Sequence, residues 1–294
     1  MSENRRIRTG VFVGIENRNE HLRKIGYSAV YFAITFILLN YTSHAWSTAN
    51  AWDLGFRPTF SYNGMQVLAG QDGWNLNRIA WVYLAPPLWG LLISILSLAS
   101  FVSIDGKHVH TRTLLFWLAV NGYLLYFSYV ITGLLSGQDY GSKLFTGFVA
   151  FYSWLLWSPA KIYGVLIVQA ILSLIVTLVF SKGILQLNYS RLSASRKRGK
   201  PIVFLNVFAF PIMAGCLLIA LTTFPMDFRY QFIRMVCLVL VGIVAGLGMA
   251  MHKAKHIQIV KGGLKPVPKA GLIILTTLIL ACRFGLRIEV EALW

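Results

Sequence analysis

Acidic residues are scarce in this chain. Aspartate and glutamate together account for 10 of its 294 residues, against 27 lysines and arginines. All of them fall outside the long apolar runs: Glu3, Glu16, Glu20, Asp53, Asp72, Asp105, Asp139, Asp227, Glu289 and Glu291. Proton-coupled transporters and intramembrane metal enzymes usually need ionisable groups at depth in the membrane. The missing acids therefore argue against a carboxylate proton relay or a cation pump.

Cysteine is also rare, and its placement argues against two kinds of site. Cys216, Cys237 and Cys282 each lie inside an apolar run, and no Cys-x-x-Cys pair occurs. Such cysteines behave as small buried hydrophobic residues, so neither a disulfide framework nor a thiol metal site is expected. Covalent haem is excluded by the lack of Cys-x-x-Cys-His, and the last apolar run has no lysine for a retinal Schiff base. No cofactor is predicted, and bound lipid is expected.

The chain has, by contrast, an excess of apolar residues. It is 56% hydrophobic and only 13% charged, with a mean hydropathy of +0.63. A soluble protein cannot bury so much apolar surface, whereas a membrane protein exposes it to lipid. The sequence predicts an all-α integral membrane protein with seven transmembrane helices. These spans lie at 25–42, 80–102, 113–134, 162–181, 202–224, 232–251 and 271–287.

Two segments on the outer side of the predicted membrane domain are unusual. The run Leu144–Trp157 is too short to span and is predicted to form an interfacial or re-entrant helix, with Trp154 and Trp157 at headgroup depth. The loop Ser43–Ile79 is long for a loop without a function. We expect it to be ordered, and either to cap the helices or to receive a partner.

Basic residues cluster between the spans and set the topology. The loop after the fourth span is rich in them and has no acid; it contains Arg191, Arg196, Lys197, Arg198 and Lys200. Insertion leaves basic loops in the cytoplasm. We therefore predict a protein of the cytoplasmic (inner) membrane, with a basic N-terminal tail at 1–24 in the cytoplasm and a short C-terminal tail at 288–294 outside. Because these basic residues lie between hydrophobic spans, the expected partners are anionic lipid headgroups rather than nucleic acid.

A few polar side chains lie inside the spans. The amides of Asn40, Asn121, Gln169 and Asn206 are expected to form hydrogen bonds between helices, since an unpaired amide in lipid is costly. Arg234 and Arg283 are the charges set back inside apolar runs. Each has two interpretations: the guanidinium reaches the headgroups along its flexible stem, or it is buried beside an outer acid such as Asp227 or Asp139.

Histidine pairs offer a weak metal-site signal. His252 and His256 have the i, i+4 spacing of a two-histidine metal site on a helix, and His108 and His110 lie in an inner loop. No acid or cysteine near His252 in sequence completes a ligand set, and the neighbouring lysines repel a cation. A solvated basic loop is the favoured interpretation.

Small residues and prolines mark the packing of the helices. Gly242, Gly246 and Gly248 in the sixth span allow another helix, a subunit or a flat ligand to approach closely, with packing inside the chain as the default. The prolines of the second and fifth spans, at 86, 87 and 211, are expected to kink their helices, with the freed carbonyls satisfied by neighbours.

The first third of the chain resembles the core of the site-2 protease family of intramembrane zinc proteases. Three segments carry the resemblance: His44-Ala45-Trp46-Ser47-Thr48, Ala85-Pro86-Pro87 and Gly137-Gln138-Asp139-Tyr140-Gly141. In that family a His-Glu-x-x-His motif and an aspartate hold zinc, which makes His44 and Asp139 the implied ligands. Ala45 stands where the family has the general base, and Thr48 where it has the second histidine. The resemblance therefore implies a catalytically degenerate relative.

These observations lead to three functional hypotheses. The first is a non-enzymatic subunit or scaffold of a larger membrane complex that docks protein partners through its outer loop and helix faces. The second is a carrier or channel for a lipid-like or neutral solute, which needs a cavity but no buried carboxylate. The third is the degenerate protease-like protein with His44 and Asp139 at its centre.

Overall fold

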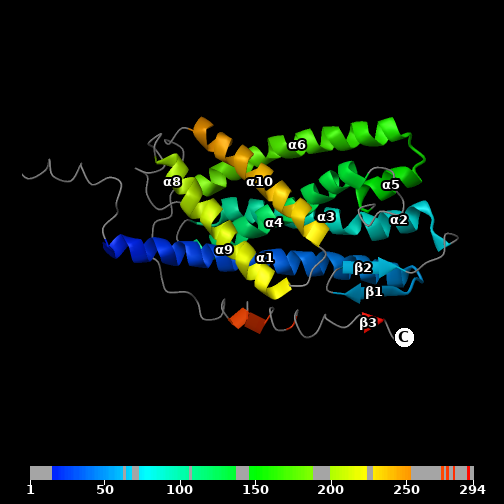
Figure 1. Cartoon of the computed structure of the whole chain (residues 1–294), viewed down its shortest axis with the longest axis horizontal. Helices are drawn as coiled ribbons and strands as arrows, with labels where there is room; N and C mark the ends of the chain where they lie inside the picture. The colour runs from blue at the N-terminus through cyan, green and yellow to red at the C-terminus, as the bar shows by residue number, and fades with distance from the viewer. Residues whose placement is uncertain are drawn as a thin grey trace, which may run out of the picture.

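The structure, a computed structural model, is mostly helical, with one small sheet (Figure 1). It describes residues 15–61, 64–67, 73–105, 108–136, 146–187, 199–223 and 228–252, and the short pieces 273–274, 276–277, 281 and 290–291. Its long helices are α1 (Ile15–Asp53), α3 (Ala85–Ser103), α4 (Val109–Ser136), α6 (Pro159–Gln186), α9 (Phe210–Thr223) and α10 (Phe228–Met251). The short helical elements are α2 (Leu76–Tyr83), α5 (Phe148–Trp154), α8 (Lys200–Phe204) and the π-helical turn η2 (Leu205–Ala209).

Six helical stretches of the described residues are long and apolar enough to cross a membrane: Leu22–Asp53, Ala85–Ser103, Val109–Ser136, Pro159–Gln186, Lys200–Ala220 and Phe232–Met251. They correspond to the first six predicted spans, so six of the seven predicted spans are confirmed as helices able to cross a membrane. The seventh predicted span, 271–287, lies outside the described residues except for a few positions. Residues 15–24, predicted as tail, belong to α1, because no glycine or proline interrupts the sequence there.

The two ends of the helix bundle differ (Figure 1). At one end, here called the sheet end, lie α2, α5 and an antiparallel sheet in the order β2-β1-β3. Its strands are β1 (Pro58–Ser61), β2 (Gly64–Val67) and β3 (Val290–Glu291). At the opposite end, here called the basic end, α8 begins and α6 and α10 finish.

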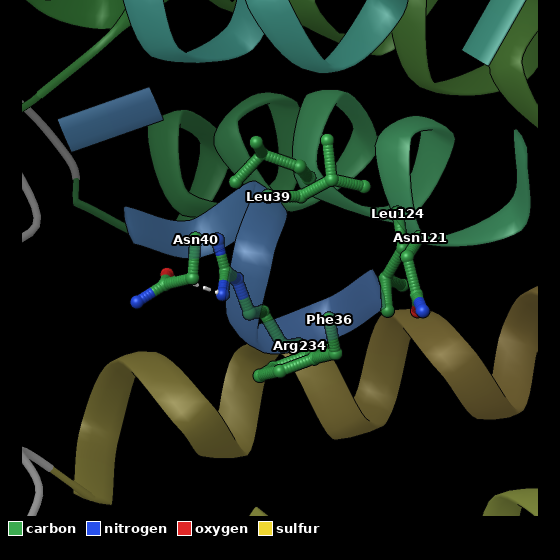
Figure 2. Close-up of a pocket in the computed structure, with 7 residues that line it drawn as sticks. Phe36, Leu39, Asn40, Asn121, Leu124 and Arg234 are labelled. Carbon is green, nitrogen blue, oxygen red and sulfur yellow. Dashed lines mark hydrogen bonds between the residues drawn. The ribbon is translucent and has the colours of Figure 1, made fainter. Parts of the chain in front are cut away.

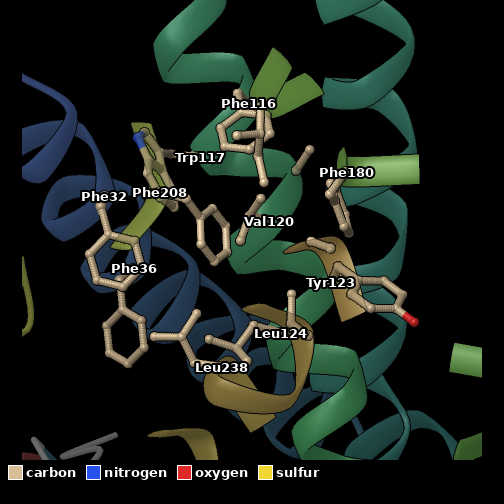
Figure 3. Close-up of a cluster of buried hydrophobic side chains, with 14 of the residues drawn as sticks. Phe32, Phe36, Phe116, Trp117, Val120, Tyr123, Leu124, Phe180, Phe208 and Leu238 are labelled. Atoms are coloured by element: carbon tan, nitrogen blue, oxygen red, sulfur yellow. The ribbon is translucent and has the colours of Figure 1, made fainter. Parts of the chain in front are cut away.

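The central helix is α4, whose residues contribute most to the main hydrophobic core (Figure 3). Trp117 of α4 is fully buried, stacks on Phe208 with ring centroids 5.6 Å apart, and meets Phe32 of α1 edge to face at 5.1 Å. Its indole N–H donates to Ser28 Oγ at 2.7 Å, which satisfies the polar atom of a buried tryptophan. Helices α1, α4 and the η2 turn therefore meet around one aromatic side chain.

Helices α3 and α4 approach closely where two glycines face each other. A Cβ added to Gly90 would lie 2.6 Å from the carbonyl oxygen of Gly122, and the reverse substitution gives the same distance. Ser94 Oγ donates to the carbonyl of Ala119 at 2.8 Å across the same contact. Small residues at this point allow backbone to touch backbone, as is common in membrane helices.

The predicted outer loop 43–79 is wrong in its limits. Helix α1 continues through these residues to Asp53 because they include no helix breaker, and it ends only at Gly55, with φ +83°. The Gly55 and Phe56 amides donate to Trp52 and Ala51, a pattern that closes a helix at a left-handed glycine. The rest of the segment holds β1, β2 and the first turn of α2.

The helix distortions predicted at prolines are observed beside Pro211 but not at Pro86 and Pro87. Pro86 and Pro87 occupy the first turn of α3, where no intrahelical N–H partner is required, so they start a helix instead of kinking one. The second predicted span is correspondingly shorter, and α2 precedes it as a separate element. Pro211 follows the π-helical turn η2, the local distortion that accommodates its missing N–H.

The predicted short helix at 144–157 is observed only as α5, Phe148–Trp154. It packs on Val130 and Tyr129 of α4 and on Leu166 of α6 in a second hydrophobic cluster. Seven residues span only about 10 Å at the rise of an α-helix, so α5 does not cross a bilayer.

Candidate functional site: buried arginines at helix junctions

Arg234, on α10, is one of the two buried arginines in the described spans (Figure 2). Its side chain is only 2% exposed, so it does not reach the headgroups. Nη1 donates to Asn40 Oδ1 of α1 at 2.7 Å, and the guanidinium carbon lies 5.1 Å from the ring centroid of Phe36. The observed hydrogen-bond partner is thus an amide of α1. Asp227 and Asp139, the acidic residues predicted as possible partners of this arginine, lie outside the described residues.

Arg234 lines a narrow pocket between α1, α4 and α10, together with Phe36, Leu39, Asn40, Asn121, Leu124 and Leu125 (Figure 2). Asn121 points its amide nitrogen at α1, donating to the Phe32 carbonyl at 3.0 Å and to Thr35 Oγ1 at 2.7 Å. The amide oxygen of Asn121 has no hydrogen-bond partner among the described residues. Two of the four predicted amides, Asn40 and Asn121, are therefore brought together around α1.

The other two predicted amides lie elsewhere. Gln169 of α6 donates to the Tyr152 hydroxyl of α5 at 2.7 Å, which ties the short helix to a span. Asn206 lies in η2 and is half-buried. The described amides with interhelical partners thus join different helix pairs, as expected for polar contacts that hold a bundle together.

A second buried arginine, Arg112, was not identified by the sequence analysis, because it directly precedes the third predicted span, 113–134. It lies in the first turn of α4 and is 2% exposed, and its guanidinium carbon is 4.7 Å from the ring centroid of Phe101 of α3. Nη2 donates to Gln186 Oε1 of α6 at 3.4 Å, and Asp105 lies within electrostatic range. The glutamine near the end of the fourth apolar run was the available signal, because an amide there needs a partner.

Three helical elements meet at the basic end. Lys200 at the start of α8 donates from Nζ to the carbonyls of Ala250 (3.2 Å) and His252 (2.9 Å), which caps the C-terminus of α10 with a cation. His252 Nε2 is 2.9 Å from Ser181 Oγ of α6. Burial, followed by the charges of Lys182 and Lys200, lowers the pKa of His252 below its usual value. His252 is accordingly a partly buried contact between α10 and α6.

The predicted packing glycines of α10 face the aromatic rings of neighbouring elements in the chain. A Cβ on Gly242 would lie 3.3 Å from the Phe208 ring, and one on Gly246 3.5 Å from the Phe204 ring. Gly248 faces α6, where an added Cβ would lie 3.0 Å from Leu178 and Ser181. Intrachain packing accounts for all three positions.

Two of the remaining predicted histidines, His44 and His110, are on helices. His44 lies on α1, close enough to Arg234 for an electrostatic interaction, and a fixed cation there disfavours a metal ion. His110, in the first turn of α4, has Nδ1 3.3 Å from the Tyr31 hydroxyl and its ring 5.2 Å from that of Tyr27. Among the described residues, no group of three histidine, cysteine or acidic side chains is placed to hold a metal.

Several predicted residues lie outside the described part of the chain: Asp139, Arg191, Arg196, Lys197, Arg198, His256, Cys282 and Arg283. Lys200 is the described member of the predicted headgroup cluster.

Comparisons of the chain with protein-family models, curated proteins and solved structures find no match. The site-2-protease resemblance stays a prediction, and function is inferred from the residues themselves.

Proposed function

We propose that this chain is a non-enzymatic subunit or scaffold of a larger membrane complex, which docks a protein partner through its sheet end. The interior polar side chains described above bond helix to helix, so they serve the fold of the bundle. In our proposal the sheet end faces outward from the inner membrane, since the basic loops keep the other end in the cytoplasm.

The observation that carries the proposal is Leu156, in the turn between α5 and α6. Its side chain is 92% exposed, and it adopts φ +55°, a left-handed conformation that a non-glycine residue adopts at a cost of about 1 kcal/mol. The next residue anchors the turn, because Trp157 stacks on Tyr152 at 4.9 Å and lies 4.1 Å from Lys161 Nζ. A rigid turn therefore holds a leucine away from its own protein, as expected for a residue that enters a pocket of a partner.

Other apolar side chains at the same end are exposed, and they extend the surface. They are Trp46 and Trp52 on the last turns of α1, Trp81 on α2 and Trp154 on α5. Underneath, the Trp74 and Phe56 rings stack 4.4 Å apart, and Asn50 Nδ2 donates to the Trp81 carbonyl at 2.8 Å. Exposed aromatic side chains on a fixed support are typical of docking surfaces.

Photo-crosslinking in native membranes tests this function. A photoreactive amino acid replaces Leu156 in one variant and Ile175 in another; Ile175 is also an exposed apolar residue, 56% exposed, in the middle of α6. The expected result is a discrete crosslinked protein band from position 156, with lipid adducts alone from position 175. Lipid adducts alone at both positions, with a monomeric particle in mild detergent, would refute the scaffold function.

A carrier for a neutral or lipid-like solute is the alternative; the feature that favours it is the pair of polar side chains, Asn121 and Arg234, that lie between α1, α4 and α10. Reconstituted flux that is lost in Asn121→Leu, but retained in Asn206→Leu, would support it over the scaffold.

A further inference from the structure

The junction of α6, α8 and α10 at the basic end gathers cationic side chains. Lys200 and His252 are linked by the hydrogen bond from Nζ to the His252 carbonyl, and the His252 ring contacts Ser181. Lys182 follows Ser181 on α6, and its charge, like that of Lys200, is close enough to act electrostatically on the His252 ring. Two ammonium groups and an imidazole thus lie around one helix junction.

This junction lies where the spans stop. The candidate span that contains α8 begins at Lys200, and the span formed by α10 ends at Met251, directly before His252. Lys182 lies one turn before the end of α6. In a bilayer these groups therefore lie near the level of the lipid phosphates.

Exposed apolar side chains continue from the cations toward the middle of the spans. Met251 (77% exposed) precedes His252, Ile202 follows Lys200 by two positions, and Val179 precedes Lys182 by three. These apolar neighbours provide a surface for acyl chains beside groups that attract a phosphate. A free anion would bind to the cations without using this apolar surface, whereas a phospholipid uses both.

We propose that Lys182, Lys200 and His252 form a binding site for the headgroup of an anionic phospholipid. Lys182 supplies the most accessible charge, because its side chain is exposed. Lys200 contributes while it caps α10. The His252 ring, whose Nε2 contacts Ser181, donates from Nδ1 to a phosphate oxygen in its protonated form, which a bound phosphate favours. Binding of the lipid stabilises the contact between α6 and α10.

The test uses the full chain purified in detergent and native mass spectrometry with phosphatidylglycerol or phosphatidylcholine of identical acyl chains. The wild type is expected to retain phosphatidylglycerol preferentially. Lys182→Gln is expected to weaken that retention about fivefold, the effect of about 1 kcal/mol for one lysine near the headgroups. Lys182→Arg keeps the charge and is expected to retain the lipid.

Lys161→Gln is the matched control, an exposed lysine at the opposite end of α6. Its phosphatidylglycerol retention is expected to equal that of the wild type. Equal retention in Lys182→Gln and the wild type overturns the proposal. Displacement of the lipid by millimolar inorganic phosphate would assign the site to a free anion and would also overturn it. No protein partner is present, so the outcome is independent of the scaffold function.

Discussion

Arg234 and Arg112 are both 2% exposed, yet they are held in different ways. Arg234 lies near the start of its span and contacts Phe36 and Asn40, which are one turn apart on α1. Arg112 lies in the first turn of α4 and is shared by Phe101 of α3 and Gln186 of α6, with Asp105 in electrostatic range.

The difference shows that two equally buried cations can depend on different partners. Arg112 has an acid in electrostatic range and a long hydrogen bond of 3.4 Å. Arg234 has a short hydrogen bond of 2.7 Å to the amide oxygen of Asn40, and removal of that acceptor leaves a buried cation with less compensation. Three experiments test this contrast, and a fourth concerns the basic end.

The largest effect is expected from Asn40→Leu. It removes the short acceptor and leaves a buried guanidinium with less solvation, so the free energy of unfolding should fall by about 2–3 kcal/mol. Denaturation with SDS from detergent micelles measures it. Asn206→Leu, which removes a half-buried amide, is the control and should change little. Equal losses in the two variants would contradict the special role of Asn40.

The ring contacts are tested next by two double-mutant cycles. Phe36→Leu with Arg234→Met, and Phe101→Leu with Arg112→Met, isolate the coupling between ring and cation. We expect about 0.5–2 kcal/mol in each cycle, with the shorter 4.7 Å contact of Phe101 at least as strong. Strictly additive variants would mean that the rings only fill space.

Gln186→Leu should have a smaller effect than Asn40→Leu. The bond that it removes is long, and Asp105 continues to compensate the charge of Arg112, so a loss of about 1 kcal/mol or less is expected. The same denaturation measures it. A loss larger than that of Asn40→Leu would reverse the comparison of the two arginines.

The smallest effect concerns pH at the basic end. Because burial and the charges of Lys182 and Lys200 lower the pKa of His252, the neutral form is favoured in the folded protein. The stability that this residue contributes is present above the unfolded pKa of about 6.5 and is lost as pH falls through the lower folded value. Thermal unfolding between pH 8 and pH 5 should show a steeper loss in the wild type than in His252→Gln. Parallel curves would show that His252 does not titrate in this range.

Parts of the fold were predictable because local composition decides them. Six apolar runs gave six spans, since a long run of apolar residues can satisfy its backbone only as a helix in lipid. The limits were less accurate. Helix α1 passed beyond its apolar run to Asp53, and Leu84 separated α2 from α3 within one predicted span.

The sequence identified residues of the candidate site but not which of them contact each other. Asn40, Asn121 and Arg234 stood out as polar residues in apolar runs. That Arg234 meets Asn40, 194 positions away, depends on the packing of α10 against α1. Arg112 was missed because a loop and the first turn of a helix have the same composition at that point.

The sequence alone determined that this is a multi-pass membrane protein with its carboxylates outside the apolar runs, because the transfer of each side chain to lipid is a local property. Only the tertiary structure decided which polar groups meet, which glycines contact a neighbouring element, and that the Leu156 side chain is 92% exposed. Those outcomes depend on contacts between helices distant in sequence, where many pairings satisfy the same hydropathy and close packing selects one.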